Sequence, residues 1–283
     1  IFSGHQRSTV PIEIVDDPFG NNDNPSRDML VEQMPPLKNW GKNILVSEFR
    51  QPNGISPEAY DLYRVLSGYD NNQIYINGFP ETVLNKGEFL ERKLDRASHI
   101  SAEKPILTAQ IKSTSDYNVF SGDNTDGDPF LMIIPPIEQY MDNYLVVNTQ
   151  AKEIDDDAYD RFGIIRYQEV YHQQYITVIV PNPAKNSLRI DGSAPQSVTW
   201  MQVPASNYSY AHIRVSDGAH EVIADEPFGI QIYGYGYANS YGYIGGMSFE
   251  PHDYKKPEIF AKDTCYIREG LILDTAYLDS GID

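Results

Sequence analysis

The sequence contains few cysteines and few basic residues for its 283 positions. Its one cysteine, Cys265, excludes an internal disulfide and a cysteine-based metal site. The 22 Lys and Arg residues stand against 40 Asp and Glu residues, and the net charge of −18 makes nucleic acid and anionic membranes poor partners. No apolar run reaches the ~18 residues that a transmembrane helix needs. The first residues show no signal peptide, so we expect any export signal to have been removed.

What the sequence does contain is a strand-forming composition. Hydrophobic residues make up 41% of the chain, and there are 21 tyrosines. The β-branched run 173–180 is stopped by Pro181-Asn182-Pro183, and the alternating segment 187–190 meets the turn signal Asp191-Gly192. Turn residues recur every 8 to 12 positions, a rhythm typical of sandwiches and barrels. These patterns predict an all-β fold. The segment 57–66 is the exception, because it is compatible with either a short helix or a strand.

Two segments, 63–90 and 174–224, follow a similar order of strands and turns, although the similarity is too weak for a sequence repeat. We therefore expect a domain over 1–250 with two β-sandwich-like lobes, roughly 1–150 and 151–250. Residues 251–283 are interpreted as a linker and the truncated start of an immunoglobulin-like module. Cys265 lies there, either as a buried reduced thiol or as half of a disulfide whose partner lies beyond Asp283.

Three motifs of proline, glycine and aromatic residues follow one another along the chain. We assign structural roles to these members of the motifs: Gln33, Pro35, Pro36, Trp40, Gly41, Pro129, Gln139, Gly234, Gly236, Ser240 and Gly242. Paired prolines before a strand fix φ and block helix, and glycines allow close backbone approach. In content and in order, the motifs resemble the N-terminal domain of the IgGFc-binding protein family over roughly residues 1–250.

The resemblance implies an extracellular β-rich module of a larger secreted or surface protein. In its low cysteine content the chain resembles the bacterial surface-protein members of the family more than the cysteine-dense mucus proteins. We expect a non-enzymatic adhesion or interaction module that binds a glycoprotein, a glycan or another protein. The alternatives are a structural subunit that self-associates in a surface layer or filament, and a glycan-active β-sandwich enzyme with two facing carboxylates. Antibody binding is not carried over to this chain.

The most informative candidate site is the alternation of glycine and tyrosine near residue 240. It predicts either a packed corner between the lobes or a surface on which sugars stack. The tyrosines concerned are Tyr233, Tyr235, Tyr237, Tyr241 and Tyr243.

Catalytic motifs are missing from the sequence: it has no G-x-S-x-G elbow, no P-loop and no H-E-x-x-H. No cofactor is required by any motif, and calcium is the best metal hypothesis, because acidic loops offer the oxygen ligands that it prefers. Solvated loops are the alternative. The candidate ligands are Asp155, Asp156, Asp157 and Asp160 in one loop, and Asp123, Asp126 and Asp128 in another.

Overall fold

The chain folds into antiparallel β-sheets joined by turns and short 3₁₀ segments. The computed structural model describes residues 6–7, 29–51, 61–112, 126–159, 165–236 and 239–249. The chain divides into two compact units, Ile1–Ser248 and Phe249–Asp283, and every element below belongs to the first. Helical structure in the described residues is limited to the 3₁₀ turns η1 (Leu37–Asn39), η3 (Ile137–Gln139) and η4 (Asn182–Ser187). The predicted all-β class is confirmed.

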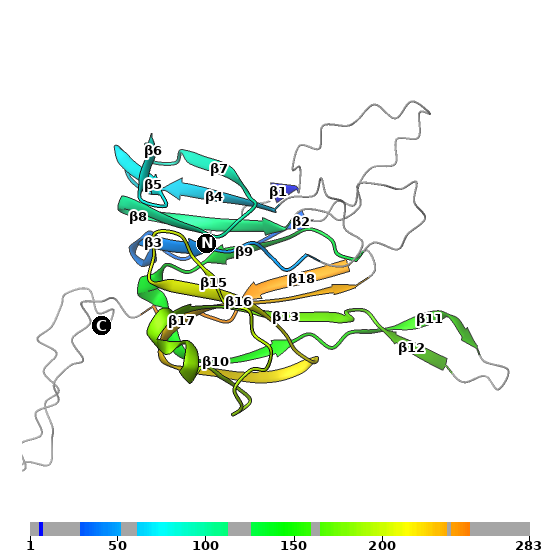
Figure 1. The fold of residues 1–283 in the computed structure, drawn as a ribbon. Helices are drawn as coiled ribbons and strands as arrows, with labels where there is room; N and C mark the ends of the chain where they lie inside the picture. Colours follow the sequence, from blue (N-terminus) through cyan, green and yellow to red (C-terminus); the bar gives the residue numbers. More distant parts are fainter. Residues whose placement is uncertain are drawn as a thin grey trace, which may run out of the picture. The chain divides into compact units, whose positions relative to one another are not determined.

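The first large sheet contains seven strands in the order β6-β5-β8-β4-β7, with β3 and β9 also paired to β8 (Figure 1). Its strands are β3 (Gly41–Val46), β4 (Asp61–Ser67), β5 (Asn72–Ile76), β6 (Phe79–Leu84), β7 (Phe89–Leu94), β8 (Ser98–Lys112) and β9 (Phe130–Ile134).

The second large sheet also contains seven strands, in the order β10-β17-β13-β16-β15, with β14 and β18 paired to β17. Its strands are β10 (Met141–Asn148), β13 (Gln173–Pro181), β14 (Arg189–Ile190), β15 (Met201–Gln202), β16 (Tyr208–Arg214), β17 (Gly218–Gly236) and β18 (Asn239–Ile244). Two small ribbons complete the described strands: β1 (Gln6–Arg7) with β2 (Met29–Leu30), and β11 (Lys152–Tyr159) with β12 (Ile165–Glu169).

The two large sheets repeat one plan, in which a single long strand pairs with four others. The first part of β8 pairs with β3 and β5, and its second part pairs with β4 and β9. Likewise β17 pairs first with β10 and β14, and then with β13 and β18. The registers agree as well, because β3 and β10 each carry one irregularity, just after Gly41 and just after Met141. The chain is therefore built from two structurally equivalent lobes.

The same local signals direct both lobes. A Pro-Pro pair precedes η1 and β3, and another precedes η3 and β10. The turn after β5 places Asn77 at φ 53°, and the turn after β14 places Asp191 at φ 52°, each followed by a glycine of positive φ. Oδ1 of Asn77 accepts from the His99 backbone N–H at 2.9 Å, and Oδ1 of Asp191 accepts from that of Glu221 at 3.0 Å. Asn and Asp tolerate this left-handed conformation, so the turn recurs in both lobes.

Equivalent parts of the lobes contact each other. Nε2 of Gln139 in η3 donates a hydrogen bond to the carbonyl oxygen of Asn39 in η1, its counterpart in the first lobe. The equivalent strands β9 and β18 also pack together. Contact between a residue and its own counterpart is the pattern of an isologous interface with approximate two-fold symmetry.

The hydrophobic core follows this arrangement. One cluster joins β3 to β9 and includes Tyr233 and Tyr235 from β17, so the second lobe completes the core of the first. A separate cluster lies between the strands of the second lobe, around Ile176, Val178 and Phe228. The chain passes from the first sheet to the second at Pro135-Pro136, and β10, which begins at Met141, already belongs to the second.

Candidate functional site

Two of the tyrosines proposed for sugar stacking, Tyr233 and Tyr235, lie inside the protein with 0% of their surface exposed. Their rings contact each other at a centroid distance of 5.6 Å. Tyr233 also contacts Phe49 edge-on at 5.2 Å and stacks on Tyr175 at 5.6 Å, and Phe130 lies against both tyrosines. Burial raises the pKa of each hydroxyl well above its usual value. The geometry of this pair therefore matches the packed corner between lobes.

Tyr241 and Tyr243 on β18 are half-buried and use their hydroxyls to hold β10. The Tyr243 hydroxyl accepts a hydrogen bond from the Val147 backbone N–H and donates one to the Val147 carbonyl, each at 2.8 Å. The Tyr241 hydroxyl accepts from the Thr149 backbone N–H at 3.0 Å. These contacts satisfy backbone groups that sheet pairing leaves open. Tyr237 lies outside the described residues.

The glycines of the same motif lie where other atoms approach the backbone closely. A Cβ atom at Gly236 would lie 1.6 Å from the Val170 carbonyl oxygen, and one at Gly242 would lie 2.3 Å from the Phe130 ring. At Gly234, a Cβ would lie 2.5 Å from the Tyr241 ring. A side chain at Gly236 would collide with backbone, and one at Gly234 or Gly242 would require packed side chains to shift, so packing favours glycine at all three positions.

The proline motif positions the start of the first lobe. Nε1 of Trp40 donates to the Pro35 carbonyl oxygen at 3.0 Å, and Pro36 caps η1. A Cβ at Gly41 would lie 2.2 Å from Cβ of Pro136, so this glycine permits contact between the lobes. Trp40 is only half-buried. The remaining motif residues are placed as follows: Gln33 is exposed, Pro129 and Gln139 are buried, and Ser240 is half-buried.

Asp126 and Asp128, two of the proposed calcium ligands, are buried and lie close to neighbouring strands. Oδ2 of Asp126 accepts from Nε2 of Gln173 and lies 2.8 Å from Nε2 of His172. The Asp128 carbonyl accepts from Oγ of Ser240. Among the described residues, no group of three or more His, Cys, Asp and Glu side chains could hold a metal ion. Asp123 and Asp160 lie outside the described residues, as do the side chains of Asp155, Asp156 and Asp157 on β11.

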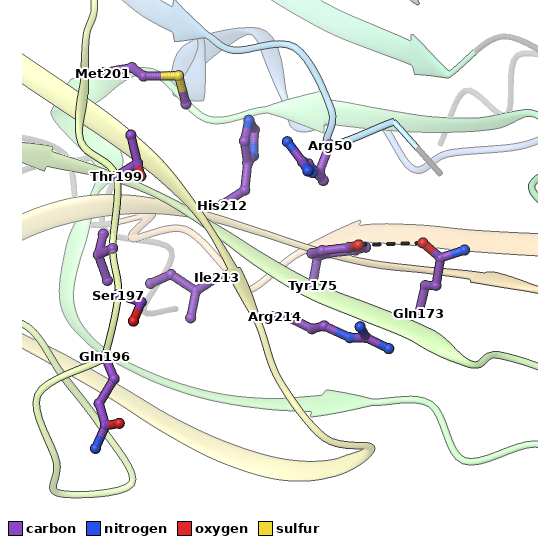
Figure 2. A pocket seen from close by; sticks show the side chains of 11 residues that line it. Arg50, Gln173, Tyr175, Gln196, Ser197, Thr199, Met201, His212, Ile213 and Arg214 are labelled. Atoms are coloured by element: carbon purple, nitrogen blue, oxygen red, sulfur yellow. Dashed lines mark hydrogen bonds between the residues drawn. The ribbon is translucent and has the colours of Figure 1, made fainter. Parts of the chain in front are cut away.

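A pocket with a volume of about 620 Å³ opens beside the junction of the lobes (Figure 2). Its walls come from β13, β16, the segment 196–201 and the residue Arg50, which follows β3 in the first lobe. The described lining residues are Arg50, Gln173, Tyr175, Gln196, Ser197, Val198, Thr199, Met201, His212, Ile213 and Arg214. The volume is in the range of small-ligand sites in proteins.

Arg50 brings a positive charge from the first lobe to this pocket. Its backbone N–H donates to the Tyr233 hydroxyl at 3.0 Å, which fixes the segment after β3 against the second lobe. Figure 2 shows its side chain beside the imidazole of His212. The guanidinium of Arg50 forms no ion pair or hydrogen bond with the described residues, and the side chain is exposed.

His212 is held as a neutral imidazole. Its Nδ1 lies 2.8 Å from Oγ1 of Thr177 and 3.3 Å from the Tyr233 hydroxyl. Burial, together with the smaller effect of the nearby Arg50 charge, lowers the pKa of His212 to about 4. Near neutral pH the positive charge of the pocket therefore comes from Arg50 and from Arg214, whose Nη2 donates to a backbone carbonyl at 3.3 Å.

At the corresponding strand positions of the first lobe, a carboxylate neutralises an arginine. There Arg64 on β4 lies directly across from Glu91 on β7, and their side chains form an ion pair at 2.5 Å. In the second lobe the corresponding strands place Thr177 across from His212. Both charges of the first-lobe pair are thus missing at this position of the second lobe, and among the described residues lining its pocket there is no Asp or Glu.

Sequence reasoning did not identify this pocket. Arg50 and Arg214 lie far apart in the chain, and neither belongs to a motif. The six histidines are scattered along the chain, and no spacing between them singles out His212. A partial signal was present, because His212 and Arg214 are two positions apart and therefore lie on one face of a strand. No local pattern indicates that the segment after β3 contacts the second lobe, as it does through the Arg50 backbone N–H and the Tyr233 hydroxyl.

The chemistry available in the pocket is recognition by charge and hydrogen bonding. Two guanidinium groups can hold an anion, and amide and hydroxyl groups can hold polar neighbours of that anion. The facing carboxylates expected for a glycan-cleaving enzyme are absent from the described lining.

Comparison with known proteins identifies the family. The family model described as IgGFc binding protein matches residues 1–234. The human IgGFc-binding protein is 25% identical over 225 residues, which cover 76% of this chain and only 4% of that protein's length. No solved structure gave a significant match. With most of its length matched by the family model, the chain belongs to the IgGFc-binding protein family.

Proposed function

We propose that this chain is an extracellular, non-enzymatic interaction module that binds a protein or glycoprotein partner. The observation that carries the proposal is the family match over residues 1–234. The same family membership supports an extracellular location, at the cell surface or in a secreted protein. In the described part of the chain, no helix is long and apolar enough to cross a membrane.

The structure supports binding through its rigid framework. Pockets that recognise ligands are largely preformed, and here part of the wall is formed by the paired strands β13 and β16, next to the contact between Arg50 and Tyr233 that joins the lobes. The polar groups that face the pocket are suited to hold a ligand's charged and hydroxyl groups. Adhesion is the role that such a module would have in a larger surface protein.

A direct binding assay tests the proposal. The name of the human relative refers to the IgG Fc region, so human Fc is the first protein probe, in native and enzymatically deglycosylated forms. A glycoprotein and glycan array supplies the broader search. We expect saturable binding to at least one glycosylated partner, and the heat-denatured chain is the control. No binding to Fc, to the array or to any surface glycoprotein tested would contradict the proposal.

Self-association is a second candidate, favoured by apolar side chains on exposed edge strands. On β6, Phe79 is 75% and Val83 is 52% exposed, and on β10 Leu145 is 76% exposed. Edges of this kind are places where another copy can pair. Light scattering coupled to size-exclusion chromatography distinguishes the candidates, because a structural subunit forms concentration-dependent oligomers that Phe79→Lys reduces. A monomer at all concentrations would eliminate this candidate.

A further inference from the structure

We propose that the pocket around Arg50 and Arg214 binds a sugar that carries a single anionic group, a carboxylate or a sulfate. This inference rests on the proposed binding function and names its ligand class. The site lies where the second lobe meets the segment after β3, and it depends on residues that belong to none of the sequence motifs.

The first argument is local charge. The whole chain has a net charge of −18, yet the described lining of this pocket has two arginines and no carboxylate. In this pocket the guanidinium of Arg50 has no ionic partner among the described residues. Arginine presents a planar set of donors that matches a carboxylate or sulfate in two parallel hydrogen bonds.

The second argument concerns the groups around the two arginines. Gln196, Ser197 and Thr199 are exposed on the loop before β15, and none of the three forms a hydrogen bond with the described residues. Ser197 adopts φ 55°, a conformation that is uncommon outside glycine and is often found at functional sites. Amides and hydroxyls of this kind are complementary to the hydroxyl groups of a sugar.

The aromatic wall favours a sugar over a peptide. Tyr175 lies in the lining, and its ring is fixed from behind by Tyr233 at a centroid distance of 5.6 Å. A rigid tyrosine offers contact area for a pyranose face at low entropic cost. The surrounding lining is mostly polar rather than the deep apolar slot that a peptide side chain would fill.

The chain's overall charge sets a limit on the ligand. A polyanion would extend beyond the pocket over a surface with a net charge of −18, and the repulsion would oppose binding. A sugar with one anionic group places its charge between the two arginines and leaves its remaining surface neutral. We therefore expect sialylated or singly sulfated oligosaccharides to bind more tightly than heparin.

The test is calorimetric titration of the 283-residue chain with sialyllactose, sulfated lactose and lactose, alongside heparin and a glutamate-rich peptide. We expect at least one acidic lactose to bind, and lactose to bind at least about tenfold more weakly, because charge-assisted hydrogen bonds to the anion are lost. Comparison of the sialylated and sulfated ligands decides whether carboxylate or sulfate is preferred.

Variants locate the binding in the pocket. Arg50→Gln and Arg214→Gln should each weaken acidic-lactose binding by about tenfold to a hundredfold. Gln196→Glu, which adds a negative charge at an exposed lining position, should weaken it as well. The matched control is Arg96→Gln, because Arg96 is 80% exposed, lies outside the pocket and should leave binding unchanged. All three lining positions are exposed, so thermal unfolding should stay close to that of the native chain.

The outcomes separate this inference from the proposed function. Binding to Fc or to neutral glycans, with no preference for acidic sugars, would overturn the inference and leave the interaction module standing. Acidic-sugar binding that the pocket variants do not alter would place the ligand elsewhere and overturn it too. Tighter binding of heparin or of the acidic peptide would overturn the ligand class. Absence of binding to every probe would count against both.

Discussion

A fully buried ion pair in the first lobe allows a quantitative test of the structure. Nζ of Lys112 lies 3.1 Å from Oδ1 of Asp61, and both side chains are 0% exposed. Oδ2 of Asp61 also accepts hydrogen bonds from Nε2 of Gln51 at 2.9 Å and from the Phe49 backbone N–H at 3.4 Å. The pair therefore fixes the segment after β3, which leads to Arg50 in the pocket.

Removing either charge alone should be costly. Lys112→Met removes the ammonium that lies 3.1 Å from the buried Asp61 carboxylate, and Asp61→Asn removes the negative charge that faces the buried Lys112 ammonium. Each change should lower the free energy of unfolding by about 3–5 kcal/mol. For a domain of this size, about 1 kcal/mol corresponds to roughly 2–4 °C in Tm, so each single variant should melt roughly 6–20 °C lower.

The double variant provides the decisive comparison. With both charges removed, the main remaining penalty is an amide N–H of Asn at position 61 facing the apolar side chain introduced at position 112, about 1–3 kcal/mol. The double variant should therefore be no less stable than either single variant, with a coupling energy of about 3 kcal/mol or more. Urea unfolding measures all four proteins. Additive single effects, or single effects below about 1 kcal/mol, would refute a buried, energetically coupled pair.

Two further predictions concern single residues. Gly236→Ala should destabilise the chain by more than about 2 kcal/mol in urea unfolding, because its Cβ would lie 1.6 Å from the Val170 carbonyl oxygen. The control is Gly87→Ala, which has φ +84° and open space around it and should lose only about 1 kcal/mol. Equal losses of stability in the two variants would contradict the close approach at Gly236. The pKa of His212 is about 4 in the folded chain, against an ordinary 6.5, so the unfolded chain binds the proton first as the pH falls. The neutral imidazole therefore contributes about 3 kcal/mol to the free energy of unfolding above pH 6.5, and this contribution is lost as the pH falls to about 4. His212→Gln should flatten the loss of stability over that window, and parallel pH profiles would exclude a buried neutral imidazole.

The sequence was sufficient to predict the fold class and the presence of two similar lobes. The alternation of β-branched residues and the turn signal Asp191-Gly192 are local features, and the predicted turn occurs there, with both residues at positive φ. The ambiguous segment 57–66 contributes strand β4 from Asp61 onward. Local signals succeeded there because strand periodicity and turn chemistry act over only a few residues.

The candidate site was less accessible to prediction. The tyrosines of β17 and β18 were recognised, but their pattern is compatible with either a core or a surface. Tyr233 and Tyr235 became core because the end of β17 packs against the core residues of the first lobe. The Tyr243 hydroxyl on β18 instead holds β10, because it forms hydrogen bonds with the backbone N–H and carbonyl of Val147. A sequence pattern specifies which residues share a strand face, whereas burial depends on what packs against that face.

By itself, the sequence determined the β-strand composition, the acidic charge balance, the repeated turns and the motifs that identify the family. Only the tertiary structure decided that two lobes face each other through equivalent elements, that Lys112 and Asp61 form a buried pair, and that Arg50 and Arg214 line one pocket. The physical reason is distance along the chain. Strand propensity and turn geometry are set by neighbouring residues, while a pocket of uncompensated positive charge requires residues from two lobes to be brought together by packing.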